Sequence, residues 1–553
     1  MGALNRAEAL RRLGTERFDV VVVGAGMTGA GIALDAATRG LSVALIDKAD
    51  VAAGTSSKSS KMVHGGLRYL QQREFRLVYE NLHERQRLLD NAPHLVSPLP
   101  FLIPLFGKDG VVSRTVARSY ASALWLYDLT GGIRIGHRHR RISAEEARSH
   151  LPTLQTDRLV AGFLYYDARG DDARVALTLA RTAADHGAAV VTYAAATALH
   201  HDARGVVRSV TVTPCGPNDA GLEPITIEAA IVVNAAGVWA DAVRGLESTE
   251  SATEITPAKG VHVSVPYHRL PCDIASVIPV PKDRRSIFVV PWKEADFVYL
   301  GTTDTAYDGP LDDPRCTPED VAYLLDAVNG STSSALTPAD VTGVWAGLRP
   351  LLKPEEGHRL KERTADLSRR HKVTVSDQGV VTVTGGKWTT YRKMAEDAVD
   401  VVVDQLGRRA RCRTAKLPLH GAPSSKAIGL ADVAGVDRAT AEHLFGRYGL
   451  DAPEVVADPN PKLRKALVDG LPYLRAEAIY AVTHEAAQDL DDVLLRRTRA
   501  GLQDARATLD AAARTAKLIA PFLGWDEQRC AAEVERFSAG LRADLVAAGL
   551  DPA

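Results

Sequence analysis

The stretch FDVVVVGAGMTGAG, Phe18 to Gly31, decides how this chain folds. Its first half, Phe18 to Val23, is mostly β-branched, which is typical of a buried parallel strand. The second half places Gly24, Gly26 and Gly29 in the spacing G-x-G-x-x-G. A strand that runs through such a turn into a helical pattern predicts a dinucleotide-binding unit.

Each part of this unit has a physical role. Gly24 allows the tight turn, Gly26 lets the backbone approach a pyrophosphate, and Gly29 permits close packing of helix and strand. The helix runs to Gly40, and its N-terminus stabilises negative phosphate. A second β run, LSVALID, ends in Asp47, where a carboxylate can hold ribose hydroxyls. That carboxylate disfavours a 2′-phosphate, which leaves NAD or FAD.

Two later stretches repeat the same order of strand, turn and helix. In IEAAIVVNAAGVWAD, a β run is followed by the tight turn that ends at Gly237, and then by Trp239. In VVTVTGGKWTTYRKM, a strand leads into Gly386, and a helix with a 3.6-residue apolar stripe runs to about Leu406 before Gly407. NAD-dependent enzymes usually complete this domain in one continuous stretch, so the two long insertions favour a split FAD domain.

The predicted architecture is therefore α/β, with more than one core because 553 residues exceed what one core holds. We expect a discontinuous, Rossmann-like FAD-binding domain in residues 15–90, 155–250 and 365–407. A mixed β-sheet substrate domain is expected in 91–154 and 251–364. Residues 410–553 are rich in alanine, leucine and paired charges, and stretches such as DRATAEHLFGRYG and DDVLLRRTRAGL predict a bundle of amphipathic helices.

Composition excludes several classes of protein. The 67 basic and 68 acidic residues nearly cancel, which argues against a nucleic-acid binder. The five cysteines are scattered and never form C-x-x-C, which argues against disulfide scaffolds, zinc ribbons and iron–sulfur clusters, so no metal is expected. Residues 1–16 are charged and lack the apolar core of a signal peptide, so we expect a cytoplasmic protein.

Membrane contact has a weak signal. The apolar run LVSPLPFLIPLF, residues 95–106, is shorter than the roughly 18–20 residues of a membrane span and carries three prolines, so a buried loop or edge strand is predicted. The basic cluster RIGHRHRRIS, Arg134 to Ser143, is a candidate for peripheral attachment to an anionic membrane surface, although a solvated loop explains it equally well.

Two long motifs identify a resemblance. VGAGMTGAGIALDAATRG, Val23 to Gly40, and GGKWTTYRKMA, Gly385 to Ala395, resemble signatures of the FAD-dependent glycerol-3-phosphate dehydrogenases, the respiratory type that passes electrons to quinone. Ala25 departs from the usual triple glycine, a small change that leaves phosphate binding possible. SSKMVHGGLRYL, KGVHVSV, YLGTTDT and GLRPLL resemble further blocks of the family in the same order, and the resemblance covers residues 15 to 545.

The resemblance implies oxidation of sn-glycerol 3-phosphate to dihydroxyacetone phosphate, with a hydride passing from C2 to flavin N5 and a base removing the hydroxyl proton. Membrane quinone would be the acceptor, and a homo-oligomer is expected. A dianionic phosphate needs several fixed cations. The residues assigned to the substrate are Arg68, Tyr69, Arg349, Arg369 and Lys387, of which Arg369 is exchangeable with Arg370 by a one-residue shift.

The resemblance also assigns cofactor and catalytic roles. SSKMVHGGLRYL would face the flavin, and its glycines would allow close approach to the ring. Beyond Gly24, Gly26, Gly29 and Asp47, the cofactor-binding residues are Ser59, Gly65, Gly66, Gly237, Trp239, Gly386, Lys387 and Thr389. Arg349 and Lys387 are also placed among the catalytic residues. His262 and His64 remain rival candidates for the general base, because neutral imidazole has a pKa of about 6.5, near working pH.

Two other functions stay open at this point. A glycerol-3-phosphate oxidase would use the same site with oxygen as acceptor, but the chain shows no extra central insertion of the kind that family oxidases carry. Another FAD-dependent amine or amino-acid oxidase would not need several cations around its substrate. The dehydrogenase is therefore the leading hypothesis.

Overall fold

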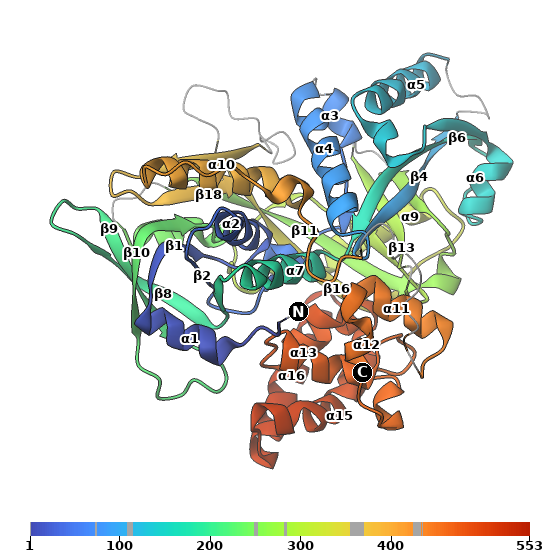
Figure 1. Cartoon of the computed structure of the whole chain (residues 1–553). Coiled ribbons are helices and arrows are strands. Elements are labelled where there is room, and N and C mark those ends of the chain that lie inside the picture. Colours follow the sequence, from blue (N-terminus) through green and yellow to red (C-terminus); the bar gives the residue numbers. More distant parts are fainter. Residues whose placement is uncertain are drawn as a thin grey trace.

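The computed structural model describes residues 2–553 except 72–73, 108–113, 248–252, 281–284, 293, 354–369, 424–432 and 434. The described residues form two β-sheets with flanking helices, and a cluster of C-terminal helices packs beneath them (Figure 1). The predicted α/β class with a helical C-terminal part is confirmed.

The first sheet is the nucleotide-binding sheet, and its central strands are parallel. Its strands, in spatial order, are β17 (His371–Val375), β18 (Val381–Gly385), β10 (Ile225–Asn234), β1 (Arg17–Val23), β2 (Val43–Ile46) and β7 (Ala189–Val191). An antiparallel pair, β8 (Ala194–His201) and β9 (Val207–Pro214), extends it from β10. The three strands expected to precede a turn and a helix therefore lie side by side, as β1, β10 and β18.

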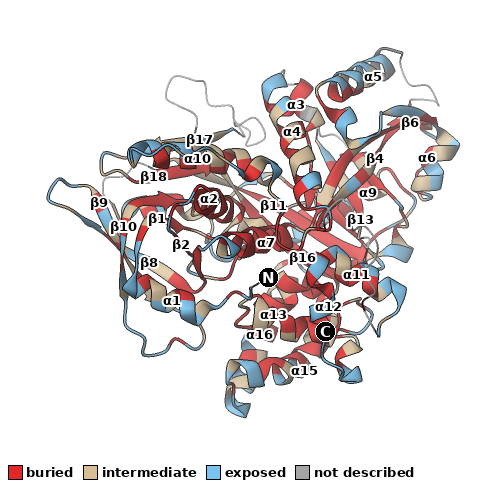
Figure 2. Cartoon of the chain, in the orientation of Figure 1, coloured by how far each residue is buried: buried red, intermediate tan, exposed pale blue. Residues whose placement is uncertain are grey.

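Three helices cover one face of this sheet: α2 (Met27–Thr38), α7 (Asp172–Asp185) and α10 (Tyr391–Gln405). Figure 2 shows α2 and α7 buried along most of their length. Small residues make this possible, since a Cβ at Gly31 would lie 2.7 Å from the Tyr391 ring of α10. Helix α10 ends at Gln405, and Gly407 follows with φ +63°, as the stop signal predicted. The other helices near this sheet are α1 (Arg6–Thr15) and α8 (Ala240–Gly245).

The second sheet is mixed and holds ten strands among the described residues. Its main path is β15 (Thr305–Ala306), β11 (Ile255–Pro266), β14 (Phe297–Gly301), β13 (Ser286–Trp292), β12 (Ala275–Pro279), β4 (Val96–Phe106), β6 (Leu159–Gly170) and β3 (Met62–Val63). Two further strands pair with β11 and β6, namely β16 (Gly343–Leu352) and β5 (Arg140–Ser143). The helices beside it are α3 (Leu67–Gln71), α4 (Phe75–Asn91), α5 (Arg114–Leu129), α6 (Ala144–His150) and α9 (Pro318–Asn329).

The apolar run at 95–106 differs from its prediction. It forms β4, which is not an edge strand, because it lies between β6 and β12. The three prolines are tolerated since β12 pairs with β4 only at Phe101 and Leu102, and the prolines lie outside that short parallel ladder.

The C-terminal helices pack on the second sheet and beneath α7 (Figure 1). They are α11 (Arg438–Tyr448), α12 (Ala452–Val455), α13 (Arg475–His484), α14 (Ala500–Gln503), α15 (Ala505–Leu523) and α16 (Glu527–Ala547). Apolar side chains of α13, α15 and α16 share one buried cluster with those of β11, β13, β14 and α9. The C-terminal part therefore has no separate core on this side.

The segment DDVLLRRTRAGL does not form the predicted amphipathic helix. Asp492–Arg497 is a π-helical turn, Arg499 has a left-handed backbone, and α14 is a single turn. The domain ranges also divide differently among the sheets, since β3 and β6 lie in the second sheet although 15–90 and 155–250 were assigned to the FAD domain. The ranges otherwise stay a prediction.

Candidate functional site

The glycine turn after β1 forms a tight cradle. Gly24 has φ +107°, and a Cβ there would lie 2.6 Å from the Ala235 carbonyl oxygen at the end of β10. A Cβ at Gly29 would lie 1.7 Å from the Gly24 carbonyl oxygen, so only glycine lets α2 start this close to the strand. The Met27 N–H donates to Ser56 Oγ at 2.8 Å, which fixes a second loop beside the start of α2.

A cavity of about 970 Å³ opens from this cradle and reaches the second sheet. The predicted site residues that line it are Gly24, Gly26, Asp47, Ser59, His64, Gly66, Tyr69, Gly237, Trp239, His262, Arg349, Gly386, Lys387 and Thr389. These residues are far apart in the sequence, and the fold brings them together around one cavity, as the prediction of a shared site requires. The cavity is large enough for a dinucleotide together with a small substrate.

Two described residues among those predicted, Gly29 and Gly65, do not line the cavity. Gly29 lies under the turn as described above. Gly65 is packed into the structure behind the cavity, where its N–H donates to Tyr127 Oη at 2.9 Å and a Cβ would lie 2.5 Å from that oxygen. Arg369 lies outside the described residues, as does the side chain of Arg68 in α3.

At one end of the cavity, Asp47 follows β2. Its Oδ2 accepts from the Ala25 N–H at 2.6 Å, and its Oδ1 accepts from the Ala49 N–H at 2.9 Å. Burial raises the pKa of Asp47 to about 6, and these hydrogen bonds partly oppose the shift. At neutral pH the carboxylate therefore remains mostly ionised and can accept hydrogen bonds from ribose hydroxyls. Trp239 forms a wall nearby, with Lys48 Nζ 4.6 Å from its ring centroid.

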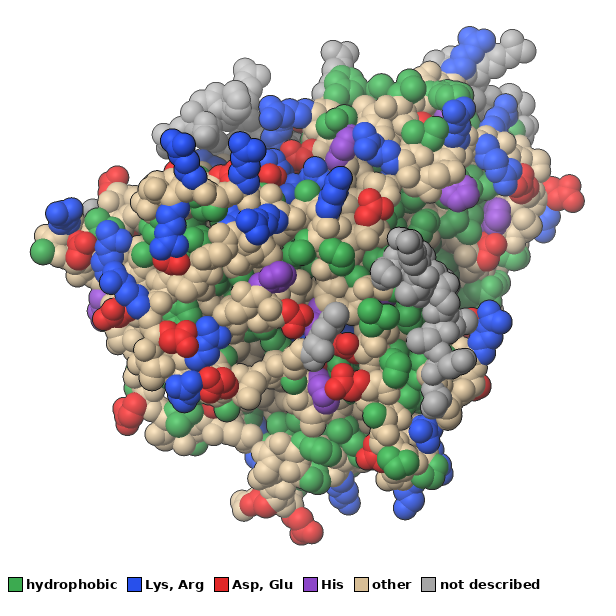
Figure 3. All heavy atoms as spheres, in the orientation of Figure 1, with side chains coloured by type: hydrophobic (Ala, Val, Ile, Leu, Met, Phe, Trp, Pro, Cys, Tyr) green, Lys and Arg blue, Asp and Glu red, His purple; other side chains and the backbone are tan. Residues whose placement is uncertain are grey.

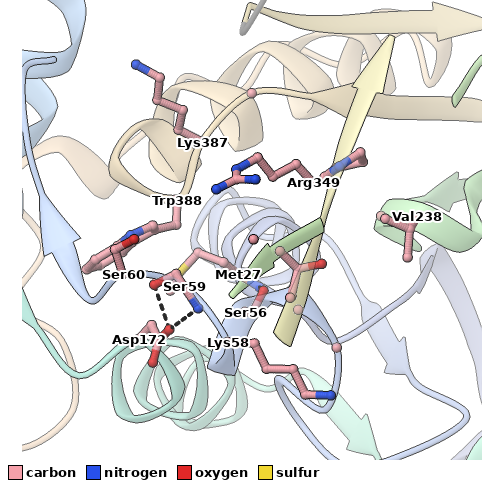
Figure 4. Close-up of a pocket in the computed structure, with 18 of the residues that line it drawn as sticks. Met27, Ser56, Lys58, Ser59, Ser60, Asp172, Val238, Arg349, Lys387 and Trp388 are labelled. Carbon is pink, nitrogen blue, oxygen red and sulfur yellow. Dashed lines mark hydrogen bonds between the residues drawn. The ribbon is translucent and has the colours of Figure 1, made fainter. Parts of the chain in front are cut away.

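Two of the predicted cations, Arg349 and Lys387, line the other part of the cavity. Arg349 on β16 donates from Nη1 to Asp304 Oδ1 at 3.2 Å and from Nη2 to the Thr303 carbonyl oxygen at 3.1 Å, which fixes the guanidinium plane. Lys387, in the turn before α10, places Nζ 3.8 Å from the Tyr69 ring centroid. Figure 4 shows Arg349 reaching from its strand across the cavity toward the side where Trp388 lies.

His262 on β11 is buried and faces the cavity. Its ring stacks on Trp345 with centroids 4.9 Å apart, and its Nε2 lies 2.7 Å from Ser60 Oγ. Within the described part of the chain, Nδ1 has no hydrogen-bond partner. Burial holds the pKa of His262 well below 6.5, and the positive charges of Lys61 and Arg349 act in the same direction, so the imidazole is neutral.

The sequence singled out the stretch that begins with Ser59 and Ser60, but it did not predict that this stretch supports His262. Ser60 contacts His262 directly, and its neighbour Ser59 donates from Oγ to Asp172 Oδ2 at 2.6 Å, as Figure 4 shows. Trp345 and Asp172 also went unnoticed. The serine-rich run before Lys61 and the acidic pair that starts α7 were visible, but nothing local indicated that they meet.

The residues fit a flavin dinucleotide. The glycine cradle leaves room for pyrophosphate, Asp47 faces the ribose end, and the cavity continues past Gly66 and Gly386 to the two cations and a neutral histidine. Backbone at glycine can approach a flat ring closely, because no Cβ intervenes. Such a fold and site define a flavin-dependent oxidoreductase.

The comparisons agree with that class and narrow it. A family model described as FAD dependent oxidoreductase matches residues 19–392, and one described as the C-terminal domain of alpha-glycerophosphate oxidase matches residues 412–530. Glycerol-3-phosphate dehydrogenase 2 of Mycobacterium tuberculosis is 40% identical over 99% of this chain and 92% of its own length. The mitochondrial glycerol-3-phosphate dehydrogenase of Mesocricetus auratus is 35% identical over 96% of this chain and 74% of its own. This chain belongs to the glycerol-3-phosphate dehydrogenase family of FAD-dependent enzymes.

A solved structure has the same overall arrangement. The glycerol-3-phosphate dehydrogenase from Bacillus halodurans, crystallised with FAD, superposes with a TM-score of 0.79 at 28% identity and covers 98% of both chains. The resemblance identified in the sequence, the FAD cofactor and the fold class are thereby confirmed.

Proposed function

We propose that this protein oxidises sn-glycerol 3-phosphate at C2 to dihydroxyacetone phosphate and passes the electrons through FAD to a membrane quinone. The observation that supports this most directly is the single cavity that joins the dinucleotide cradle to Arg349, Lys387 and a neutral His262. A phosphate ester with a neighbouring carbinol needs cations at one end and a proton acceptor at the other.

The chain's own residues would hold FAD at both ends. Gly24, Gly26 and the start of α2 would bind the pyrophosphate, and Asp47 the ribose. The turn at Gly386 and Thr389, which begins the segment leading into α10, would lie along the ring system. FAD, when bound, supplies the hydride acceptor.

Arg349 and Lys387 would bind the substrate phosphate. Arg349 suits this role because Asp304 and the Thr303 carbonyl hold its guanidinium in place, so little side-chain entropy is lost on binding. Lys387 lies against Tyr69, which orients its ammonium group in the same way. Together the two cations would place the C2 carbinol rather than react with it.

His262 would accept the proton of the C2 hydroxyl. Its imidazole is neutral before substrate binds, since burial and nearby cations disfavour the charged form. Stacking on Trp345 and the contact with Ser60 Oγ fix the ring plane, so the ring is ready for proton transfer. His64 also lines the cavity and remains the alternative base.

The assignments can be tested by anaerobic stopped-flow reduction of the flavin by glycerol 3-phosphate. We expect His262→Gln to lower the limiting reduction rate by about 10²–10⁴-fold, as for loss of a general base. Arg349→Ala should mainly weaken substrate binding, and unphosphorylated glycerol should reduce the flavin far more slowly. A His262→Gln enzyme that keeps its rate, beside a His64→Gln enzyme that loses it, would move the base to His64.

A membrane acceptor requires a surface that meets the bilayer. None of the described helices combines the length and the apolar character that a bilayer span needs. The exposed residues Trp125 and Leu129 of α5 and Ile133 just beyond it stand beside exposed Arg134 and Arg138 of the predicted basic cluster. Figure 3 shows Lys and Arg side chains with hydrophobic ones between them at the upper right, where α5 and β6 lie. Aromatic and apolar side chains among cations suit peripheral attachment to an anionic leaflet.

The acceptor and the surface are tested together. Oxidation of the reduced flavin by a soluble quinone should be much faster than by oxygen, and fast oxidation by oxygen alone would favour an oxidase. Sedimentation with vesicles of anionic lipid should require Trp125 and Leu129 and weaken at high salt. The homo-oligomer stays a prediction.

A further inference from the structure

Arg499 lies where the C-terminal helical part meets the candidate site. It separates the π-helical turn Asp492–Arg497 from α14 and has a left-handed backbone, φ +71°. Its side chain is 1% exposed. A bulky residue in that backbone conformation is uncommon, and it persists only where surrounding contacts define it.

Those contacts reach out of the C-terminal part. The Arg499 Nη1 donates to the Leu495 carbonyl oxygen at 3.2 Å, which fixes the side chain in its own segment. The Nε donates to Asp171 Oδ1 at 3.1 Å, and Nη2 donates to Asp172 Oδ1. The guanidinium thus holds both carboxylates at the start of α7.

Asp172 carries this contact to the cavity wall. Its Oδ2 accepts from the Ser59 N–H at 2.9 Å and from the Ser59 Oγ at 2.6 Å, and Lys61 Nζ donates to Oδ1 at 3.2 Å. Ser60 lies between Ser59 and Lys61 in the sequence, and its Oγ lies 2.7 Å from His262 Nε2. A continuous path of hydrogen bonds and one peptide unit therefore runs from Arg499 through Asp172 to His262.

The same turn also contacts the strand that carries His262. The Leu502 carbonyl oxygen accepts from Ser264 Oγ at 2.7 Å, and Ser264 lies two residues beyond His262 on β11. Leu502 packs in the cluster that contains Trp345, on which His262 stacks. Trp345 Nε1 in turn donates to the Ser59 carbonyl oxygen at 3.4 Å. Arg499 therefore contacts Asp172, and Leu502 contacts Ser264 and packs in the cluster of Trp345, so the turn touches several groups that support His262.

We propose that Arg499 is a positioning residue for the reaction, and that the turn Arg499–Leu502 of the C-terminal part completes the site by fixing Ser60 and His262. This inference rests on the proposed role of His262. Small displacements matter here, because a shift of about 1 Å in a reacting group can lower a rate about 10²-fold.

The alternative is that Arg499 only stabilises the junction. Arg497 provides a matched control, since it is equally buried, lies two residues away, and donates to Asp50 Oδ1 at 2.9 Å. Its side chain pairs with Asp50 and Glu485, and in the part of the chain that the structure describes these two carboxylates form no hydrogen bond or ion pair with Ser59, Ser60 or His262. A purely structural role predicts the same behaviour for variants at both positions.

The test compares Arg499→Gln and Arg499→Lys with Arg497→Lys, each as full-length holoenzyme with its FAD content measured. Anaerobic stopped-flow gives the limiting rate of flavin reduction and the apparent Kd of glycerol 3-phosphate, and thermal unfolding gives Tm. We expect Arg499→Gln to lower the limiting rate about 10–100-fold with a Kd changed less than about threefold, and Arg499→Lys to restore part of it. Arg497→Lys should lower Tm and leave the rate within about twofold of wild type.

An Arg499→Gln enzyme whose rate matches that of Arg497→Lys would overturn the proposal. If Arg499→Gln fails to fold, Ser264→Ala removes only the hydrogen bond to the Leu502 carbonyl, and an unchanged rate in that variant would overturn it instead. Two different results would contradict the proposed function: glycerol 3-phosphate does not reduce the flavin of the wild-type enzyme, or His262→Gln does not slow the reduction. In either of those cases the inference falls with it.

Discussion

The glycine cradle lines the cavity directly, whereas the buried junction at Arg499 reaches it through Asp172, and the two regions are built from different kinds of residue. The cradle uses small residues that are neighbours in the sequence, and it relies on backbone packed where a Cβ would collide. The junction uses long charged side chains from distant segments, such as Asp50 with Arg497 and Arg174 with Glu485. A short motif therefore describes the first region, whereas only the folded chain reveals the second.

The largest effect on stability should come from the junction. We expect Arg497→Ala to lower the free energy of unfolding by about 3–5 kcal/mol, because it leaves the buried Asp50 carboxylate with fewer partners. Urea unfolding of the holoenzyme measures this. As a control, Arg438→Ala breaks a solvent-exposed pair with Glu442 and should cost under about 1 kcal/mol. If both variants lost the same free energy of unfolding, the buried ion pair would be no more important for stability than the surface pair, which would contradict this prediction.

The cradle should show a smaller loss of stability but a specific loss of cofactor. Gly29→Ala places a Cβ 1.7 Å from the Gly24 carbonyl oxygen, so α2 must shift. We expect about 1–3 kcal/mol of destabilisation and much weaker FAD binding, measured by the flavin absorbance that survives gel filtration. Gly540→Ala in α16 meets open space and should retain FAD fully. Full FAD retention by Gly29→Ala would contradict the cradle.

The smallest effect should be a pH dependence at His420, which joins the end of α7 to Asp451 between α11 and α12. Its Nδ1 lies 2.6 Å from Asp185 Oδ2 of α7, and its Nε2 lies 2.7 Å from Asp451 Oδ2. Burial lowers the pKa of His420, but the hydrogen bonds to Asp185 and Asp451 outweigh burial, so the pKa is raised above 6.5.

A raised folded-state pKa stabilises the protein below the unfolded value, and this contribution disappears as pH rises through the folded value. The decrease in the free energy of unfolding caused by His420→Gln should therefore be larger near pH 6 than near pH 9. Exposed His268→Gln serves as the control and should show no such trend. If the difference in the free energy of unfolding between wild type and His420→Gln grew toward alkaline pH, the raised pKa of His420 would be contradicted.

Much of the nucleotide-binding sheet was predictable because its information is local. The strand at 18–23, the turn at Gly24 and the late return at Gly386 each show in a few neighbouring residues, and the structure places their strands in one sheet with β10 between them. Arg349 and His262 were found through resemblance, and their shared cavity depends on the pairing of β11 with β16.

The buried charged junction and the interior position of β4 could not be predicted from the sequence, for physical reasons. DDVLLRRTRAGL has the alternation of charged and apolar residues that a surface helix shows, so nothing indicated that Asp492, Arg497 and Arg499 would be buried. The partners of Arg497 and Arg499 lie hundreds of positions away, at Asp50 and Asp172. Likewise, β4 carries prolines that suggest an edge, and only the short length of its pairing with β12 explains why it lies inside the sheet.

The central claim is that one cavity joins a flavin to a phosphate-bearing alcohol. The most direct measurement is the visible spectrum of the purified holoenzyme, recorded without oxygen before and after addition of glycerol 3-phosphate. We expect the flavin band to bleach with glycerol 3-phosphate and to persist with glycerol. A flavin band that persists with glycerol 3-phosphate, or that bleaches equally with an amino acid, would contradict it.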